Sequence, residues 1–146
     1  MKIRKIVTVE KPIEAVFAYL SDFTTTTLWD PGTVHTIRVK GDGLIGTEYL
    51  NTSIFAGRKT QLTYVVEEFT RNQNIRLRGE NKNVIAHDTM TFRQIGTKTE
   101  VTYTAELSSK GLTRLIAIFL KPAFDRLGNE AEVGMAKALS ELGGNN

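Results

Sequence analysis

Asp88 is the residue whose surroundings in the sequence point most directly to chemistry. It stands between Ala86 and Met90 at two-residue spacing, in a segment that alternates apolar and polar residues as a half-buried strand does. This spacing places its carboxyl group on the apolar face, where an unpaired charge is costly. Asp88 must therefore pair with another group, hold its proton more tightly than usual, or meet water in a cavity.

Two roles are open to this carboxyl group. As a general acid or base it would move a proton beside a carbonyl group, as an aldol-type cyclisation or a dehydration requires. Alternatively, it bonds a turn or a neighbouring guanidinium such as that of Arg76, and its role is structural. The structural role is favoured, since the sequence shows no second carboxylate that would act as a catalytic partner of Asp88. Tyr64 and Tyr103 can bring hydroxyl groups to the same apolar site, although a buried tyrosine usually hydrogen-bonds within the protein.

The two histidines make a poor metal site. His35 shares its alternation with Ile37 and Val39, which predicts that it points inward near a cavity mouth, whereas His87 is expected to face outward. The sequence has no HxxxH pair, no cysteine and no serine in a GxSxG elbow. We therefore expect no metal, no cofactor and no nucleophilic hydrolysis.

The glycines of "GDGLIG", residues 41–46, have the GxGxxG spacing of a dinucleotide-binding loop. Such a loop works only where a helix begins at once and directs its N-terminus at the pyrophosphate. Here the next residues, "TEYLNTSIF", have a strand pattern, and no helical segment occurs between Gly46 and Gly111. We predict a hairpin in which Gly41 and Gly43 adopt positive φ and Gly46 starts the next strand.

The elements that must position these residues follow from the hydrophobic period. Residues 2–10 are rich in β-branched side chains and predict a strand, and residues 11–23 predict a helix with Pro12 in its first turn. Six further segments then alternate with a period close to two and are joined by short turn-like connections: 33–40, 46–55, 59–69, 74–80, 83–95 and 98–107. Consecutive strands with short connections predict an antiparallel meander.

From about Ser109 the pattern changes to that of one long helix. Pro122 is expected to bend or divide it near Leu120. This helix is the only element long enough to cover the apolar face of the sheet. We therefore predict an α+β fold in which a curved antiparallel seven-stranded sheet wraps around the C-terminal helix, with short helices after the first strand. The predicted apolar stripe of the helix comprises Leu112, Leu115, Ile116, Phe119, Leu120, Leu127, Met135, Leu139 and Leu142.

A sheet wrapped around a helix cannot close tightly everywhere, so we predict a cavity between them. Trp29 would close one end of it, and Phe119 and Phe124 would contact a ligand from the helix. A mostly apolar wall with a few polar points is typical of a small-molecule site of ~300–1,000 Å³, although each apolar residue could equally fill the core. The predicted ligand-binding residues are Trp29, His35, Tyr64, Asp88, Met90, Phe92, Tyr103, Phe119 and Phe124.

Composition and charge exclude several classes of protein. The 146 residues, 40% hydrophobic and 24% charged, are typical of one globular domain, here residues 1–146. Nineteen Lys and Arg against sixteen Asp and Glu are interleaved, whereas nucleic-acid binders concentrate their positive charge. No apolar run approaches the ~20 residues that span a bilayer, and residues 1–12 lack the features of a signal peptide. We expect a cytoplasmic monomer or homodimer with neither nucleic-acid nor integral-membrane partners.

The stretch "KPIEAVFAYLSDFTTTTLWDPG" resembles the N-terminal signature of the START-related helix-grip superfamily, which includes birch-pollen-allergen-like proteins and polyketide cyclase/dehydrases. "GDGLIGTEY" resembles the glycine-rich hairpin of those proteins, and "QIGTKTEVTYTAEL" resembles their last hairpin and strand. The matching element order covers the whole chain. The residues that carry the N-terminal resemblance are Pro12, Val16, Phe17, Asp22, Trp29 and Pro31.

The resemblance implies that a hydrophobic ligand is enclosed between the sheet and the long helix. Members bind lipids, sterols, hormones or polyketides, some catalyse cyclisation or dehydration, and others act as chaperone regulators. Three functions therefore stay open for this chain. The leading one is binding of a small hydrophobic molecule, such as a lipid, a sterol-like molecule or an aromatic polyketide. The alternatives are a polyketide cyclase or dehydratase that uses Asp88, and a protein-interaction module that uses an outer basic face around Arg76 and Arg78.

Overall fold

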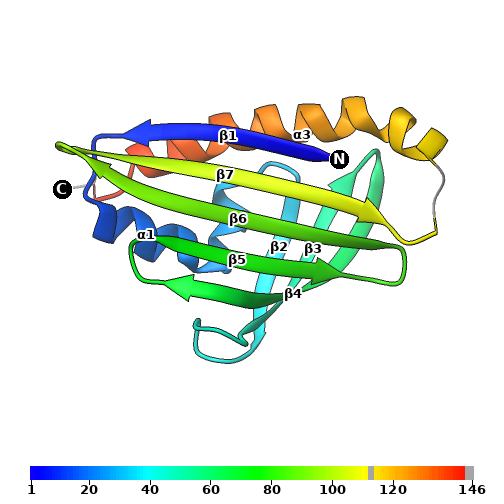
Figure 1. Cartoon of the computed structure of the whole chain (residues 1–146), viewed down its shortest axis with the longest axis horizontal. Helices are drawn as coiled ribbons and strands as arrows, with labels where there is room; N and C mark the ends of the chain where they lie inside the picture. Colours follow the sequence, from blue (N-terminus) through cyan, green and yellow to red (C-terminus); the bar gives the residue numbers. More distant parts are fainter. Residues whose placement is uncertain (112–113, 144–146) are drawn as a thin grey trace.

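Seven strands form one curved antiparallel sheet in the order β1-β7-β6-β5-β4-β3-β2 (Figure 1). The computed structural model describes residues 1–111 and 114–143, and the side chains of residues 114–116 lie outside this description. Each strand from β2 to β6 pairs with the next one in the chain, and β7 pairs on its other side with β1. The predicted meander and seven-stranded sheet are confirmed. The strands are β1 (Lys2–Val9), β2 (Thr33–Lys40), β3 (Glu48–Phe55), β4 (Arg58–Thr70), β5 (Asn74–Glu80), β6 (Val84–Ile95) and β7 (Lys98–Ser109).

The glycine-rich segment is the connection between β2 and β3, as the hairpin prediction requires. Gly41, Gly43 and Gly46 have φ of +93°, +100° and +89°. At Gly41 a side chain would also meet the backbone of Thr47 at 2.8 Å, so only glycine fits there. Gly46 still belongs to the turn, since β3 begins two residues later, at Glu48.

Three short helices follow β1 and cover one end of the sheet. They are α1 (Ile13–Ser21), the 3-10 helix η1 (Phe23–Thr25) and α2 (Thr26–Trp29). Pro12 precedes the first turn of α1, and the side chain of Asp22 caps η1 by accepting a hydrogen bond from the backbone N–H of Thr24. The polar "TTTT" stretch, residues 24–27, is helical, since it belongs to η1 and α2.

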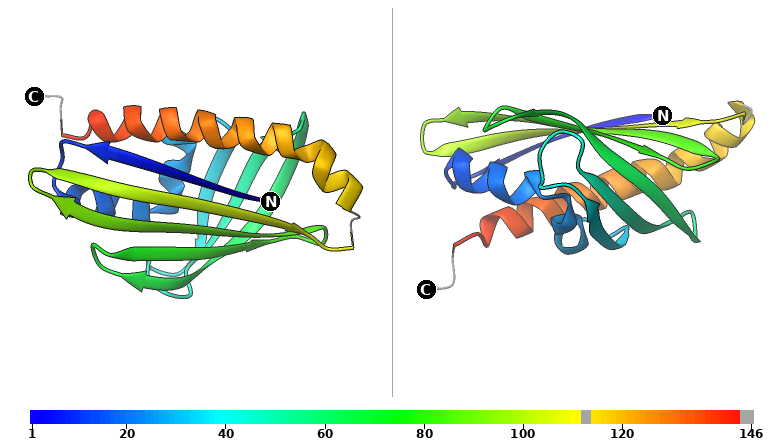
Figure 2. Two further views of the ribbon diagram at one scale, coloured as in Figure 1. Left: turned by 45° about the horizontal axis from the view of Figure 1, so that its top comes forward. Right: turned by 90° about the horizontal axis from the view of Figure 1, so that it is seen from below.

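The long helix α3 (Arg114–Ser140) lies against the concave face of the sheet, alongside β1 (Figure 2). It continues across Pro122, and its axis changes direction near its N-terminal end in Figure 2. Phe124, Met135 and Leu139 are buried against the sheet side. Phe119 is 80% exposed, so its place in the predicted apolar stripe is wrong. The predicted stripe residues Leu112, Leu115 and Ile116 lie outside the described side chains.

The concave face of the sheet carries the core. Leu62, Tyr64 and Val66 of β4 are buried. The alternating inward residues of the last two strands are buried as well: Ala86, Asp88, Met90 and Phe92 on β6, and Val101, Tyr103 and Ala105 on β7. Near α1 the core is tightly packed, where the ring of Phe17 contacts those of Phe69 and Phe92 edge to face. No helix among the described residues is both long and apolar enough to cross a membrane.

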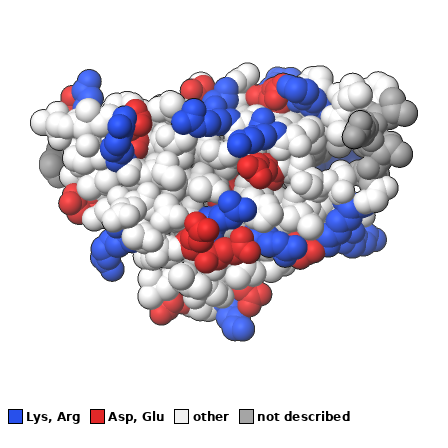
Figure 3. Space-filling model, in the orientation of Figure 1, with Lys and Arg blue, Asp and Glu red and all other residues white. Residues whose placement is uncertain are grey.

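The opposite, outer face of the sheet carries charges of both signs. In Figure 3 the Lys and Arg side chains of this face stand beside Asp and Glu side chains. Arg76 pairs with Glu67 at 3.6 Å, and Arg78 pairs with Glu80 at 2.7 Å. The outer face is therefore a mixed surface and not a concentrated positive patch.

Candidate functional site

A cavity of about 240 Å³ lies between the sheet and the N-terminal half of α3. Alternate residues of the central strands line it from the open end inward. On β6 these are Val84, Ala86 and Asp88, and Met90 then lies buried beyond the cavity. The cavity is slightly smaller than the expected range, because the α1 end of the concave face is filled by core side chains.

The floor of the cavity is made by three polar side chains on adjacent or nearby strands. They are Tyr64 of β4, Asp88 of β6 and Tyr103 of β7. The ring of Tyr64 fits because Gly79 faces it across the β4–β5 pair, where a Cβ atom would come within 2.6 Å of the Tyr64 Cε1 atom. A glycine in the middle of β5 is thus explained by the cavity floor.

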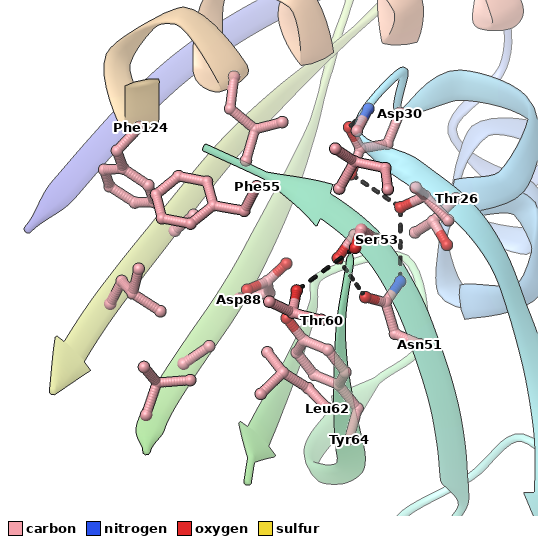
Figure 4. A pocket seen from close by; sticks show the side chains of 18 of the residues that line it. Thr26, Asp30, Asn51, Ser53, Phe55, Thr60, Leu62, Tyr64, Asp88 and Phe124 are labelled. Carbon is pink, nitrogen blue, oxygen red and sulfur yellow. Dashed lines mark hydrogen bonds between the residues drawn. The ribbon is translucent and has the colours of Figure 1, made fainter. Parts of the chain in front are cut away.

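Aromatic rings close the sides. The ring of Trp29 meets Tyr103 edge to face with centroids 5.7 Å apart, and Phe23 packs against Tyr64 at 4.9 Å. At the open end the rings of Phe55 and Phe124 are perpendicular, with centroids 6.4 Å apart. Figure 4 shows this pair on one side of the cavity and the polar side chains of Thr26, Asn51 and Ser53 on the other.

Asp88 is paired, and its partner is Tyr103. The Tyr103 hydroxyl donates a hydrogen bond of 2.9 Å to Asp88 Oδ2, and Asp88 is only 7% exposed. Burial raises the pKa of Asp88 to about 7, the Tyr103 hydrogen bond opposes this, and the negative charge of Asp30 adds to it. The structural alternative in which Arg76 pairs with Asp88 is wrong, because Arg76 lies on the outer face with Glu67.

Asp30 is a second carboxyl group on the cavity wall, which the sequence did not reveal. It follows α2, and its side chain accepts hydrogen bonds from the backbone N–H of Gly32 at 3.0 Å and from the Thr33 hydroxyl at 3.0 Å. Burial raises the pKa of Asp30, while these two hydrogen bonds lower it. The "WDPG" context indicated only a turn, so nothing in the sequence placed this carboxyl group near Asp88.

A hydrogen-bonded group of polar side chains, also missed in the sequence, makes the β3 side of the cavity. The Asn51 amide donates to the Thr36 hydroxyl at 2.8 Å and accepts from the Ser53 hydroxyl at 3.0 Å. Thr36 in turn shares a hydrogen bond of 2.6 Å with Thr26. Asn51 and Ser53 are two residues apart on β3, so they face the same side of the strand. This spacing was the only feature of the sequence that could have placed them together.

Trp29 contributes a polar atom as well as a ring. The side chain is 2% exposed and lines the cavity, and its indole Nε1 donates no hydrogen bond to any described residue. A buried donor without an acceptor costs about 1–3 kcal/mol. An acceptor on a bound molecule would remove this cost if it reached that atom.

Five of the nine predicted ligand-binding residues lie on the cavity wall and four do not. His35 is exposed, because Thr36 and not His35 is the buried residue of β2, so the inward prediction is wrong. Phe119 points into solvent. Met90 and Phe92 are buried as predicted, but they pack in the core outside the cavity wall. The five on the wall are Trp29, Tyr64, Asp88, Tyr103 and Phe124.

Within residues 1–111 and 114–143, no three His, Asp or Glu side chains lie close enough together to hold an ion. His87 is the histidine nearest to a carboxylate, 3.9 Å from Glu67, and both lie on the outer face of the sheet. The groups that the cavity offers to a ligand are hydrogen-bonding side chains, two carboxyl groups and an aromatic wall.

The sequence model of the family described as "Polyketide cyclase / dehydrase and lipid transport" matches residues 1–139. The chain belongs to this family. The match spans every strand and nearly all of α3, so it includes the whole cavity wall. The resemblance inferred from the sequence is confirmed.

Solved structures similar to this family member share its fold. The ZhuI aromatase/cyclase from Streptomyces sp. R1128 superposes with a TM-score of 0.81 at 13% identity, over 97% of this chain and 94% of that one. The protein TTHA0849 from Thermus thermophilus gives 0.78 at 17% identity over the whole of both chains. A START superfamily protein from Mycobacterium smegmatis gives 0.71 at 17% identity, over 95% of this chain and 94% of that chain. No curated protein matches the sequence.

Proposed function

We propose that the chain binds a small hydrophobic molecule in the cavity between the sheet and α3. The observation that carries the proposal is the cavity itself, with its aromatic walls and a floor made by Tyr64, Asp88 and Tyr103. A well-packed protein interior leaves few voids larger than a water molecule, so a cavity of about 240 Å³ calls for an occupant. Membership of a family whose description includes lipid transport supports the same function.

A neutral fluorescent probe tests this proposal without assuming the natural ligand. Phenylnaphthylamine is hydrophobic and uncharged, and its fluorescence rises in an apolar site. We expect micromolar binding, accompanied by quenching of Trp29, the single tryptophan of the chain. Mass spectrometry of the protein under native conditions then identifies any molecule retained through purification.

A cavity-filling variant shows where the probe binds. Ala105 is buried on the cavity wall, so Ala105→Leu would occupy part of the space. We expect this change to weaken probe binding about tenfold or more, because the added atoms overlap the ligand. Ala136→Leu, on the exposed face of α3, is the matched control and should leave binding unchanged. Equal binding by both variants would place the probe elsewhere and contradict the proposal.

Catalysis is a second candidate function, and the Asp88–Tyr103 pair favours it. A carboxyl group with a pKa of about 7 is present in both protonation states near neutral pH, as a general acid or base should be. In this function Asp88 would move a proton during the cyclisation or dehydration of a bound polyketide. Asp88→Asn should then lower kcat/KM about 10²- to 10⁴-fold on an aromatic polyketide substrate, with Glu67→Gln as the outer-face control. Unchanged turnover in Asp88→Asn would rule this role out.

The third function, a protein-interaction module, is not supported by the charges on the outer face of the sheet. It depended on a positive outer face around Arg76 and Arg78, and both side chains are paired with glutamates. Surface ion pairs of this kind leave no concentrated charge to recognise an acidic partner. The cavity therefore supports ligand binding better than this alternative.

A further inference from the structure

The charged groups on the cavity wall are all acidic. Among the described lining residues the ionisable acids are Asp30 and Asp88 inside the cavity and Glu106 at its edge, where Glu106 pairs with Lys2 at 3.7 Å. No described lysine, arginine or histidine lines the cavity. This contrasts with the chain as a whole, which carries a net charge of +3.

Such a wall discriminates between ligands by charge. A carboxylate or phosphate group that entered would lose its hydration without meeting a cation, and it would be repelled by the carboxyl groups already present. A positively charged group would instead meet Asp88. The Oδ2 atom of Asp88 accepts the Tyr103 hydrogen bond, and its Oδ1 atom accepts none from the described residues. One acceptor at the cavity floor is thus left for a donor on a ligand.

The aromatic walls suit the same kind of ligand. Trp29, Tyr64 and Tyr103 stand around the cavity floor, and aromatic faces attract organic cations. The unpartnered Trp29 Nε1 is an independent sign that the site is incomplete without a bound molecule. Because this atom is a donor and an ammonium group has no acceptor, its partner would have to be an acceptor elsewhere on the ligand. Farther out, Phe55 and Phe124 provide an apolar surface for the body of the molecule.

We propose that the cavity is selective for a hydrophobic amine, whose ammonium group lies against Asp88 and whose apolar body lies between the aromatic walls. This inference rests on the proposed ligand-binding function and adds the chemical class of the ligand. It also requires that hydrophobic acids of the same size, fatty acids among them, bind poorly.

Three matched compounds test the charge selectivity on the unaltered protein. Naphthylethylamine, naphthylethanol and naphthylacetic acid share one aromatic body and differ in the charge of the polar end. Isothermal titration calorimetry at pH 8, where Asp88 is mostly ionised, gives the three affinities side by side. We expect the amine to bind about ten- to a hundredfold more tightly than the acid, with the alcohol between them, as a hydrogen bond between charged partners predicts.

The outcomes separate this inference from the proposed function. If the acid binds as tightly as the amine, the charge selectivity is refuted while the cavity remains a ligand site. If none of the three binds but the neutral probe does, the amine inference again falls and the binding function stands. If the probe also fails to bind, both are refuted.

An Asp88→Asn variant then assigns the selectivity to one residue. The substitution keeps the shape and the Tyr103 hydrogen bond but removes the charge. We expect the affinity for the amine to fall to that for the alcohol, and the affinity for the alcohol to change less than twofold. Glu67→Gln removes a carboxylate from the outer face of the same sheet and should alter neither. A retained amine preference in Asp88→Asn would overturn the assignment, and circular dichroism verifies that the variant is folded.

Discussion

The hydroxyl group of Tyr103 on β7 donates a 2.9 Å hydrogen bond to the carboxyl group of Asp88 on β6, at the floor of the cavity. The two residues are diagonal neighbours, since Asp88 is paired in register with Ala105 and Met90 with Tyr103. This diagonal contact gives a buried carboxyl group a partner without burying a second charge. Burial of this carboxyl group, which the hydrogen bond only partly offsets, makes the protonation of Asp88 depend on folding.

The stability of the chain should fall as the pH rises through the range in which Asp88 ionises. Folding raises the pKa of Asp88 from 3.8 to about 7, so the folded chain holds a proton that the unfolded chain releases. This contribution to the free energy of unfolding is complete below pH about 4 and is lost by pH about 7. Asp88→Asn removes the effect, and at pH 8 the variant should be more stable than the wild type by up to about 4 kcal/mol.

Urea unfolding at pH 4.5, 6 and 8 measures this difference. The curves of stability against pH for the wild type and for Asp88→Asn should converge at acidic pH and separate toward pH 8. Glu67→Gln serves as the control, because that carboxylate is exposed and its loss should leave the wild-type pH dependence in place. Parallel curves for the wild type and Asp88→Asn would show that Asp88 has an ordinary pKa.

Tyr103→Phe tests the hydrogen bond directly. The bond favours the ionised form of Asp88, so its removal should raise the pKa of Asp88 further and cost about 1 kcal/mol of stability at pH 8. The carbon-13 chemical shift of the Asp88 carboxyl group, followed by NMR over pH, reports the titration. Tyr64→Phe removes the other floor hydroxyl, which makes no hydrogen bond to Asp88, and should not raise this pKa. Identical titrations in the two variants would contradict the assigned role of Tyr103.

The inward faces of β4, β6 and β7 could be predicted from the sequence because those segments keep a regular two-residue period. Asp88 and Tyr103 were placed correctly for this reason. The edge strand β2 breaks the rule. Its register shifts between Thr33 and His35, and the buried position goes to Thr36, which is hydrogen-bonded to Thr26 and Asn51. A polar residue therefore points inward while His35 points outward, and apolar alternation alone cannot reveal this.

The helix shows a different limit. Phe119 and Phe124 were both predicted to contact the ligand, yet residues five apart on a helix point about 140° away from each other. Only one of them can face the cavity, and the sequence did not decide which. The site residue Asp30 was missed for a third reason. Asp30 lies in a turn after α2, and only the tertiary fold brings it to the cavity wall. No local sequence pattern therefore indicates its position.

These two phenylalanines make a matched pair of variants. Phe124 is buried at the open end of the cavity against Phe55, so Phe124→Ala should cost about 3 kcal/mol of stability and speed the release of the neutral probe. Phe119→Ala removes a ring that is 80% exposed and should change stability by less than about 0.5 kcal/mol. Urea unfolding and stopped-flow release of the probe measure the two effects. Faster release from Phe119→Ala than from Phe124→Ala would reverse the assignment of the helix faces.

Gly134 should be the glycine of α3 that tolerates alanine least. Replacing glycine by alanine inside a helix usually stabilises it by about 1 kcal/mol. At Gly134, however, the added Cβ atom would overlap the backbone carbonyl oxygen of Trp29, which cannot rotate away. Either α3 would have to move away from α2, or the backbone at Trp29 would have to shift. We expect Gly134→Ala to cost about 2 kcal/mol or more and to shift the fluorescence of Trp29.

Gly128 is the internal control for this prediction, because it lies in the same helix but faces β1. There the added Cβ atom would meet the end of the Ile3 side chain at 2.5 Å, and that flexible group can adopt another rotamer. Gly128→Ala should therefore stay within about 1 kcal/mol of the wild type, with the helix propensity of alanine offsetting the contact. If both substitutions stabilise the chain equally, the close approach of α3 to the Trp29 carbonyl does not constrain the helix, and the prediction is wrong.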